Sequence, residues 1–189
     1  MPIPGNLSGR KWWIGNQGKY PNSRDVADLD VDFQSRVADF IRSLRDAGAT
    51  IAISSTRRNA IRAHLMHFSW MVAYGQIEPK DVPKKPGLDI EWDHGEIDKS
   101  RAAAMEMVNL FNMAHIASLT SNHITGKAID MSIIWKGELV LTRPAPLLLK
   151  IESTPRNGNG NRELHDAGGQ VFQVFKLRSD PPHWSFNGR

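Results

Sequence analysis

The chain has 189 residues and no cysteine, so disulfide bonds, thiolate metal sites and cysteine nucleophiles are all excluded. Any bound metal must therefore use His, Asp or Glu side chains. Long apolar runs are also missing, and no stretch approaches the ~20 residues that a membrane-spanning helix needs. We therefore expect no insertion into a membrane. The opening letters MPIPGNLSGRKWW lack the basic start and apolar run of a secretion signal, so we expect synthesis in the cytoplasm without a signal peptide.

A strong excess of one charge is absent as well. The chain carries 24 Lys and Arg residues against 20 Asp and Glu residues, a formal net charge of +4. Its basic residues are scattered and do not form the dense stripe with interleaved aromatic residues that is typical of nucleic-acid binders. We therefore expect no nucleic-acid partner. The small positive excess favours weak attraction to anionic polymers, among them the bacterial envelope.

The composition is that of an ordinary globular protein, with 40% hydrophobic residues, 15 Gly and 11 Pro. The length fits one domain. We expect a single unit over residues 1–189 that acts as a monomer. Residues 1–28 are rich in Gly, Asn, Pro and Lys and are expected to form an irregular arm anchored by Trp12 and Trp13.

Hydrophobic periodicity predicts helices before strands along the chain. The expected helices cover residues 31–48, after an N-cap at Asp30, 59–75 and 99–114. The expected strands cover 50–56, 128–135, 138–142 and 170–177. We expect the second and third strands to pair as a hairpin around Lys136 and Gly137, and a loop over 155–163. This order indicates an α+β domain with a small, mainly antiparallel sheet and flanking helices.

One segment, SNHITGKAID, carries a metal-binding pattern. Ser121, His123, Gly126, Ala128 and Asp130 fill the fixed positions of S-x-H-x-x-G-x-A-x-D. Five such matches coincide by chance on the order of once in ten thousand chains of this length. A hydrolytic zinc site takes three nitrogen or oxygen ligands and leaves a position for water. His123 and Asp130 supply two such ligands, and Gly126 lets the backbone turn between them.

This pattern resembles the zinc motif of the peptidases that include D-Ala-D-Ala dipeptidases, D,D-carboxypeptidases and L-Ala-D-Glu phage endolysins, and whose fold is related to the Hedgehog signalling domain. The resemblance covers roughly residues 50 to 189. It implies a Hedgehog/DD-peptidase-like fold, Zn²⁺ as cofactor, His183 of SDPPHWSF as the third ligand beside His123 and Asp130, and Asp180 as general base. Trp184 completes the match.

The family base is usually Glu, so Asp180 is shorter by one methylene and must be brought closer by the backbone. Pro181 and Pro182 would do this either as a stiff extended segment or through a cis-proline turn. The sequence leaves both open.

Four further residues are candidates for contacts with substrate. By resemblance, Arg57 at the end of the first expected strand polarises a carbonyl or binds a carboxylate, and its neighbour Arg58 could take the role instead. Ser121 is expected to orient substrate or to bond the loop. His94, in the string LDIEWDHG, is a candidate substrate contact or alternative metal ligand.

The function implied is that of a zinc metallopeptidase that hydrolyses peptide bonds of peptidoglycan stem peptides, as carboxypeptidase or endopeptidase. It would act on the bacterial cell wall, in the periplasm, after release of the chain, as a phage endolysin or an exported effector does. The alternative is a non-hydrolytic zinc-containing binding module of the same fold, which the Asp at position 180 favours. Other metals could replace zinc, because a set of two His and one Asp is not selective.

Overall fold

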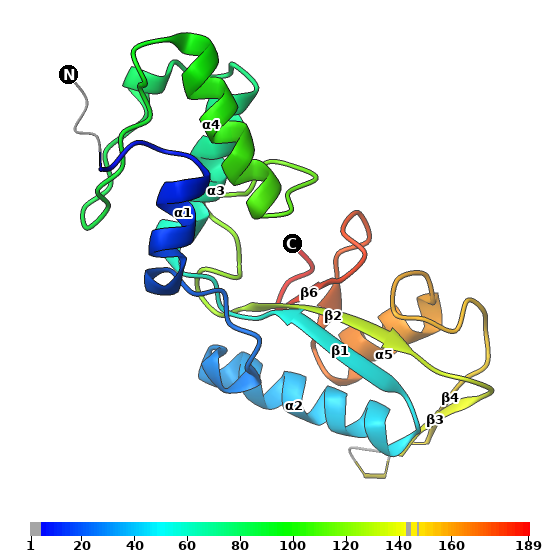
Figure 1. Cartoon of the computed structure of the whole chain (residues 1–189). Coiled ribbons are helices and arrows are strands. Elements are labelled where there is room, and N and C mark those ends of the chain that lie inside the picture. Colours follow the sequence, from blue (N-terminus) through cyan, green and yellow to red (C-terminus); the bar gives the residue numbers. More distant parts are fainter. Residues whose placement is uncertain (1–4, 143–144, 147) are drawn as a thin grey trace. The chain divides into compact units, whose positions relative to one another are not determined.

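The computed structural model describes residues 5–142, 145–146 and 148–189. By its internal contacts the chain divides into two compact units (Figure 1), and the expectation of a single domain stays a prediction. Unit 1 comprises Met1–Pro21 and Asn59–Ser121, and unit 2 comprises Asn22–Arg58 and Asn122–Arg189. Each unit has a hydrophobic core of its own. Within the described ranges, none of the helices has the length and apolar character to cross a membrane.

Unit 1 is helical. Its helices are α1 (Arg10–Asn16), α3 (Ala60–Ala73) and α4 (Ile97–Leu110), with short 3-10 turns η1 (Gln17–Lys19) and η3 (Pro79–Asp81). The side chain of Asn59 begins α3, because its Oδ1 accepts a hydrogen bond from the N–H of Ile61 at 2.8 Å. The core of the unit consists of Trp12, Trp13, Tyr20, Leu65, Phe68, Val72, Trp92, Ala104 and Met107.

The N-terminal segment is more regular than expected, since Arg10–Asn16 is helical. The string LDIEWDHG holds it in place. The N–H of Ser8 donates to the carbonyl of Glu91 at 2.8 Å, and the indole N–H of Trp12 donates to the carbonyl of Asp89 at 2.9 Å. His94 contributes through its Nε2, which lies 3.0 Å from the hydroxyl of Ser8. The unusual string therefore binds the start of the chain.

Unit 2 is a four-stranded sheet with helices packed on it, in the strand order β1-β2-β6-β5, and all neighbouring strands are antiparallel. This confirms the expected α+β class with a small antiparallel sheet. The strands are β1 (Thr50–Ser55), β2 (Ala128–Ile134), β5 (Phe175–Lys176) and β6 (His183–Ser185). The helices are the 3-10 turn η2 (Val26–Asp28), α2 (Val31–Asp46) and α5 (Arg162–Val171).

The alternation of side chains along β2 decides what faces the core. Ile129, Met131 and Ile133 are buried against α2, together with Trp184 of β6. Successive side chains of a strand point to opposite faces. Asp130 therefore lies on the face of the sheet that does not bury the core.

Two expectations about the later strands were wrong. Residues 162–171 are helical, because the Oδ1 of Asn161 caps α5 by accepting from the N–H of Leu164 at 2.8 Å, so only Phe175–Lys176 remains of the strand expected over 170–177. The expected hairpin is also absent from the described residues. β2 is paired on both edges, so β3 (Leu139–Leu141) pairs with β4 (Leu149–Ile151) in a separate two-stranded sheet.

Candidate metal centre

Strand register brings two of the expected ligands together. Asp130 of β2 is the direct partner of His183 of β6 in the antiparallel ladder. Directly opposed residues share a face and have Cβ atoms roughly 5 Å apart. The next residue of β6, Trp184, points the other way and is fully buried in the core. The packing of Trp184 therefore fixes the strand that presents His183.

The third side chain, His123, comes from a tight loop before β2. The N–H of Lys127 donates to the carbonyl of Asn122 at 2.8 Å, which closes the loop. The N–H of Arg58, after β1, donates to the carbonyl of His123 at 2.9 Å, which ties the loop to the sheet. Gly126 has φ +73°, a left-handed conformation that favours glycine. The loop thus holds His123 beside the two strands.

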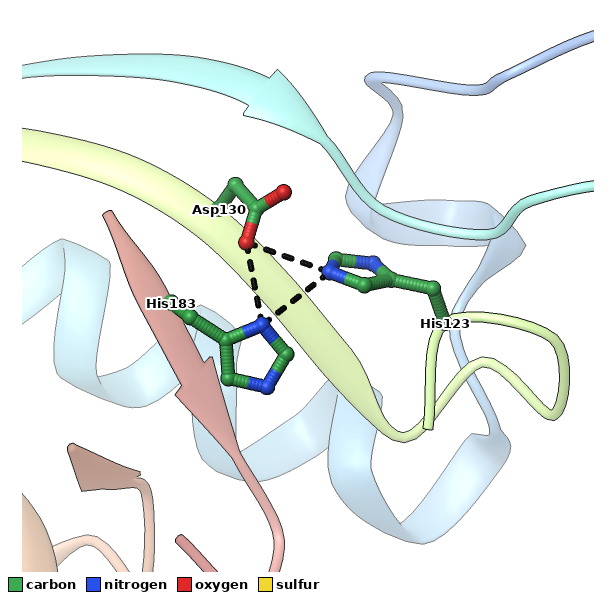
Figure 2. A group of neighbouring side chains, drawn as sticks. All are labelled: His123, Asp130 and His183. Carbon is green, nitrogen blue, oxygen red and sulfur yellow. Dashed lines mark hydrogen bonds and ion pairs between the residues drawn. The ribbon is translucent and has the colours of Figure 1, made fainter. Parts of the chain in front are cut away.

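The three side chains meet in a small triangle (Figure 2). The Nε2 of His123 lies 3.1 Å from the Oδ1 of Asp130 and 3.2 Å from the Nδ1 of His183, and that Nδ1 lies 3.1 Å from the same Oδ1. Tetrahedral zinc with bonds of about 2.0–2.1 Å places its ligands about 3.3 Å apart. The spacing therefore fits a small divalent cation at the centre.

Hydrogen bonds on the outer side of each imidazole ring determine which of its nitrogens faces the centre. The Nδ1 of His123 donates to the main-chain oxygen of Thr56 at 2.6 Å, and the Nε2 of His183 donates to the main-chain oxygen of Arg189 at 3.1 Å. A neutral imidazole carries only one proton. In each neutral ring, the nitrogen that faces the triangle therefore has no proton and offers a lone pair. Two lone pairs and a carboxylate oxygen converge, which requires a cation or an added proton between them.

The neighbouring histidines favour the ionised carboxylate of Asp130, against the effect of burial. The side chains of His123, Asp130 and His183 are 3%, 16% and 7% exposed. Burial by itself would raise the pKa of Asp130. In the absence of a cation, protonated His123 and His183 would donate to the carboxylate and attract its charge, which outweighs burial and holds the pKa well below its usual value. The group is therefore an anionic ligand set that could hold a metal ion.

The two candidate arginines differ in their surroundings. Arg57 is exposed, whereas Arg58 is half-buried. Burial lowers the pKa of Arg58, and the nearby charges of Asp130 and Asp180 raise it. The Nε of Arg58 also donates to the side-chain oxygen of Asn22 at 3.4 Å. Arg58 is thus the arginine whose charge interacts with the centre.

Asp180 lies at the turn that leads into β6. Its side chain is exposed and does not belong to the three-residue ligand group. The N–H of His183 donates to the carbonyl of Asp180 at 3.0 Å, which makes a turn over Pro181 and Pro182. Both of these prolines follow trans peptide bonds. The segment is therefore a trans turn, and neither expected form, extended or cis, is present.

Lys176 is a residue that the sequence analysis missed. Its ammonium donates to the main-chain oxygens of Leu177, Asp180 and His183, at 2.5, 2.7 and 3.1 Å. All three N–H donors of the side chain are thereby used on the turn that carries His183. No sequence signal marks this lysine, because its role depends on the pairing of β5 with β6. Burial lowers the pKa of Lys176 to about 8, against the nearby charges of Asp180 and Asp130.

We expect Lys176→Met to weaken metal binding by about 10- to 100-fold, because groups that orient a ligand residue contribute at this level. The three freed carbonyls would let the turn move and would misplace His183. Isothermal titration with zinc measures the change. Lys150→Met is the matched control, because Lys150 is an exposed lysine of unit 2 paired with Glu138 at 3.0 Å. Equal zinc affinity in both variants would remove Lys176 from the centre.

The remaining candidates, Ser121 and His94, belong to unit 1, whereas the ligand group lies in unit 2. The contact of His94 with Ser8 gives it a role within its own unit. Substrate binding by Ser121 and His94 stays a prediction.

Comparisons of the chain with protein-family models, with curated proteins and with solved structures found no match.

Proposed function

We propose that the chain is a zinc-dependent metallopeptidase that hydrolyses peptide bonds of peptidoglycan stem peptides, as carboxypeptidase or endopeptidase. The observation that carries the proposal is the convergence of two imidazole lone pairs and one carboxylate oxygen within 3.2 Å, each ring being fixed from behind by a main-chain oxygen. Three nitrogen and oxygen ligands leave a fourth zinc position for water, as in hydrolytic sites. The substrate class rests on the resemblance of the SNHITGKAID and DPPHW segments to the peptidoglycan peptidases.

The roles of the protein groups follow from their chemistry. Bound zinc would supply Lewis-acid polarisation of a carbonyl and would acidify water. His123, Asp130 and His183 would hold the ion. Asp180 would accept a proton from water, as a general base does. Arg58 would bind the substrate carbonyl or carboxylate, because a guanidinium is always charged and donates in pairs.

The proposal places the activity on the bacterial cell wall, reached after release of the chain, as for an endolysin or an exported effector. The test is digestion of purified sacculi, with and without chelator and with zinc added back, followed by mass spectrometry of the released fragments. Chelator-sensitive release of muropeptide fragments is expected, and the fragments identify the bond that is cut. A chain that binds zinc and releases nothing from any sacculus would contradict the peptidase.

A second candidate function is a non-hydrolytic zinc-containing binding module. The exposure of Asp180 favours it, since this carboxylate is open to solvent and is shorter than the usual Glu. The peptidase and the binding module differ in the role that they give to Asp180. A base is required for turnover, while a binding module has no use for one.

We therefore expect Asp180→Asn to lower the cleavage rate by about 10²- to 10⁴-fold while zinc affinity stays within a few fold, because general-base catalysis contributes at this level. Zinc titration and sacculus cleavage are measured on the same preparation. Asp32→Asn, an exposed acid on α2, serves as control. Unchanged cleavage in Asp180→Asn would take this residue out of the mechanism.

A further inference from the structure

Unit 1 contains a cavity of about 520 Å³ that the proposed chemistry does not use. It is lined by side chains from the N-terminal segment, from α3 and from the stretch 79–92, among them Asn6, His64, Lys80, Lys84, Lys85 and Trp92. Cavities of this volume are typical of sites for small ligands.

Two polar atoms of the lining lack partners. The Nε2 of His64 and the Oδ1 of Asn6 are buried, and neither finds a hydrogen-bond partner among the described residues. His64 is only 6% exposed. Buried polar groups in folded proteins are nearly always paired, because an unpaired one costs free energy. A hydrogen-bond donor on a ligand in the cavity would supply the missing partner of each atom.

Both atoms are acceptors. The amide nitrogen of Asn6 donates to the carboxylate of Asp89 at 2.7 Å, which leaves Oδ1 as the acceptor end. The main chain of Pro83 has a carbonyl but no N–H, and it favours the protonated ring of His64, so we assign the ring proton to Nδ1 and leave Nε2, which has no partner, as the acceptor. Burial, with the charges of Lys85 and His67, lowers the pKa of His64 to about 4, so the ring is neutral at pH 7 and Nε2 holds a lone pair.

The rim of the cavity is positively charged. Lys80, Lys84 and Lys85 are exposed and form no ion pair with any residue that the structure describes. The lining also contains two acids, Asp89, which accepts from the amide of Asn6, and Glu91, which accepts from the N–H of Asp93 at 3.0 Å, so the three lysines exceed the acids by one charge. The cavity thus offers buried acceptors and free ammonium groups.

We propose that this cavity binds an acidic peptide, whose N–H groups reach the buried acceptors and whose carboxylates pair with the lysines. The identity of the peptide rests on the proposed function: a peptidoglycan stem peptide has both kinds of group, which would give unit 1 a second, non-catalytic site for the wall. A nucleic-acid strand fits less well, because single strands stack on exposed aromatic rings and Trp92 is 4% exposed.

The test uses the full chain stripped of metal by a chelator, so that the peptide is not cleaved during the titration. A soluble stem peptide, and the same peptide with its carboxylates amidated, are titrated calorimetrically. We expect the acidic form to bind and the amidated form to bind more weakly. The double variant Lys84→Ala/Lys85→Ala should weaken binding of the acidic form roughly tenfold, through the loss of two charge-assisted contacts. Lys11→Ala, an exposed lysine on α1 outside the lining, should bind normally.

His64→Phe removes the buried acceptor while keeping a ring, and it should also weaken binding; circular dichroism checks its fold. Absence of binding, binding that is equal in the double variant and the Lys11→Ala control, or preference for a short oligonucleotide would overturn the proposal. Cleavage of sacculi by the zinc-loaded chain is measured separately from peptide binding. A chain that binds the peptide but never cleaves sacculi counts against the peptidase, whereas one that cleaves but does not bind when metal-free counts against the cavity.

Discussion

Asp130→Asn is expected to abolish stoichiometric zinc binding and to reduce sacculus cleavage to background. Asp130 is the anionic ligand of the triangle, and its Oδ1 lies 3.1 Å from the facing nitrogen of each histidine. The amide has the same shape but no charge, so zinc affinity should fall by more than about 100-fold, beyond the loss that an orienting group causes. The fold should persist, because the amide N–H₂ can donate to the lone pairs of His123 and His183.

Zinc content is measured by mass spectrometry of the metal and folding by circular dichroism. Asp39→Asn is the control, since its exposed ion pair with Arg42 contributes little. An Asp130→Asn chain that still holds one zinc per molecule would show that the three residues are not the ligands. The same result would leave the triangle as a proton-sharing group.

Gly126→Ala is expected to lower the free energy of unfolding of unit 2 by about 2–4 kcal/mol, through left-handed strain and a steric clash. Residue 126 has φ +73°. A Cβ there would lie 2.8 Å from the main-chain nitrogen of Asp30, which itself donates to the carbonyl of Gly126 at 3.0 Å. Because backbone cannot move aside as a flexible side chain does, the loop would shift and carry His123 with it. Urea unfolding with and without zinc measures the loss.

Gly137→Ala is the matched control for the clash. Gly137 also has a positive φ, +71°, but a Cβ there would meet nothing within 4 Å. Its cost should be the strain alone, about 1 kcal/mol. Equal losses in the two variants would mean that the close approach to Asp30 does not matter, and that Gly126 serves only the turn.

The ligand group could be predicted from sequence because its signals are local. His123 and Asp130 lie seven positions apart in one motif, and the alternation of AIDMSII places Asp130 on the face opposite to Ile129 and Met131. The prediction that His183 is the third ligand rested on the resemblance to the peptidase family. In the structure, the register of β2 with β6 places His183 beside Asp130.

Features set by pairing between distant segments could not be predicted. Lys176 acts through main-chain oxygens of a turn, which accept from any suitably placed donor and leave no trace in the sequence. The strand expected over 170–177 was wrong because α5, which begins after the cap at Asn161, continues to Val171. Arg57 and Arg58 are adjacent, and they are distinguished by the burial of Arg58 and by its nearness to the charges of Asp130 and Asp180, which depend on the fold.

The division into two units was also hidden, because each unit is built from two separate stretches of chain. Composition and length report the total hydrophobic content, and they do not report how it is divided between cores.

The most direct test of the central claim is a crystal structure of the zinc-loaded chain with anomalous data collected on both sides of the zinc absorption edge. We expect one strong anomalous peak among the Nε2 of His123, the Oδ1 of Asp130 and the Nδ1 of His183, present above the edge and lost below it. A triangle with no peak, in a crystal grown with excess zinc, would mean that protons hold these side chains together, and it would contradict the zinc peptidase.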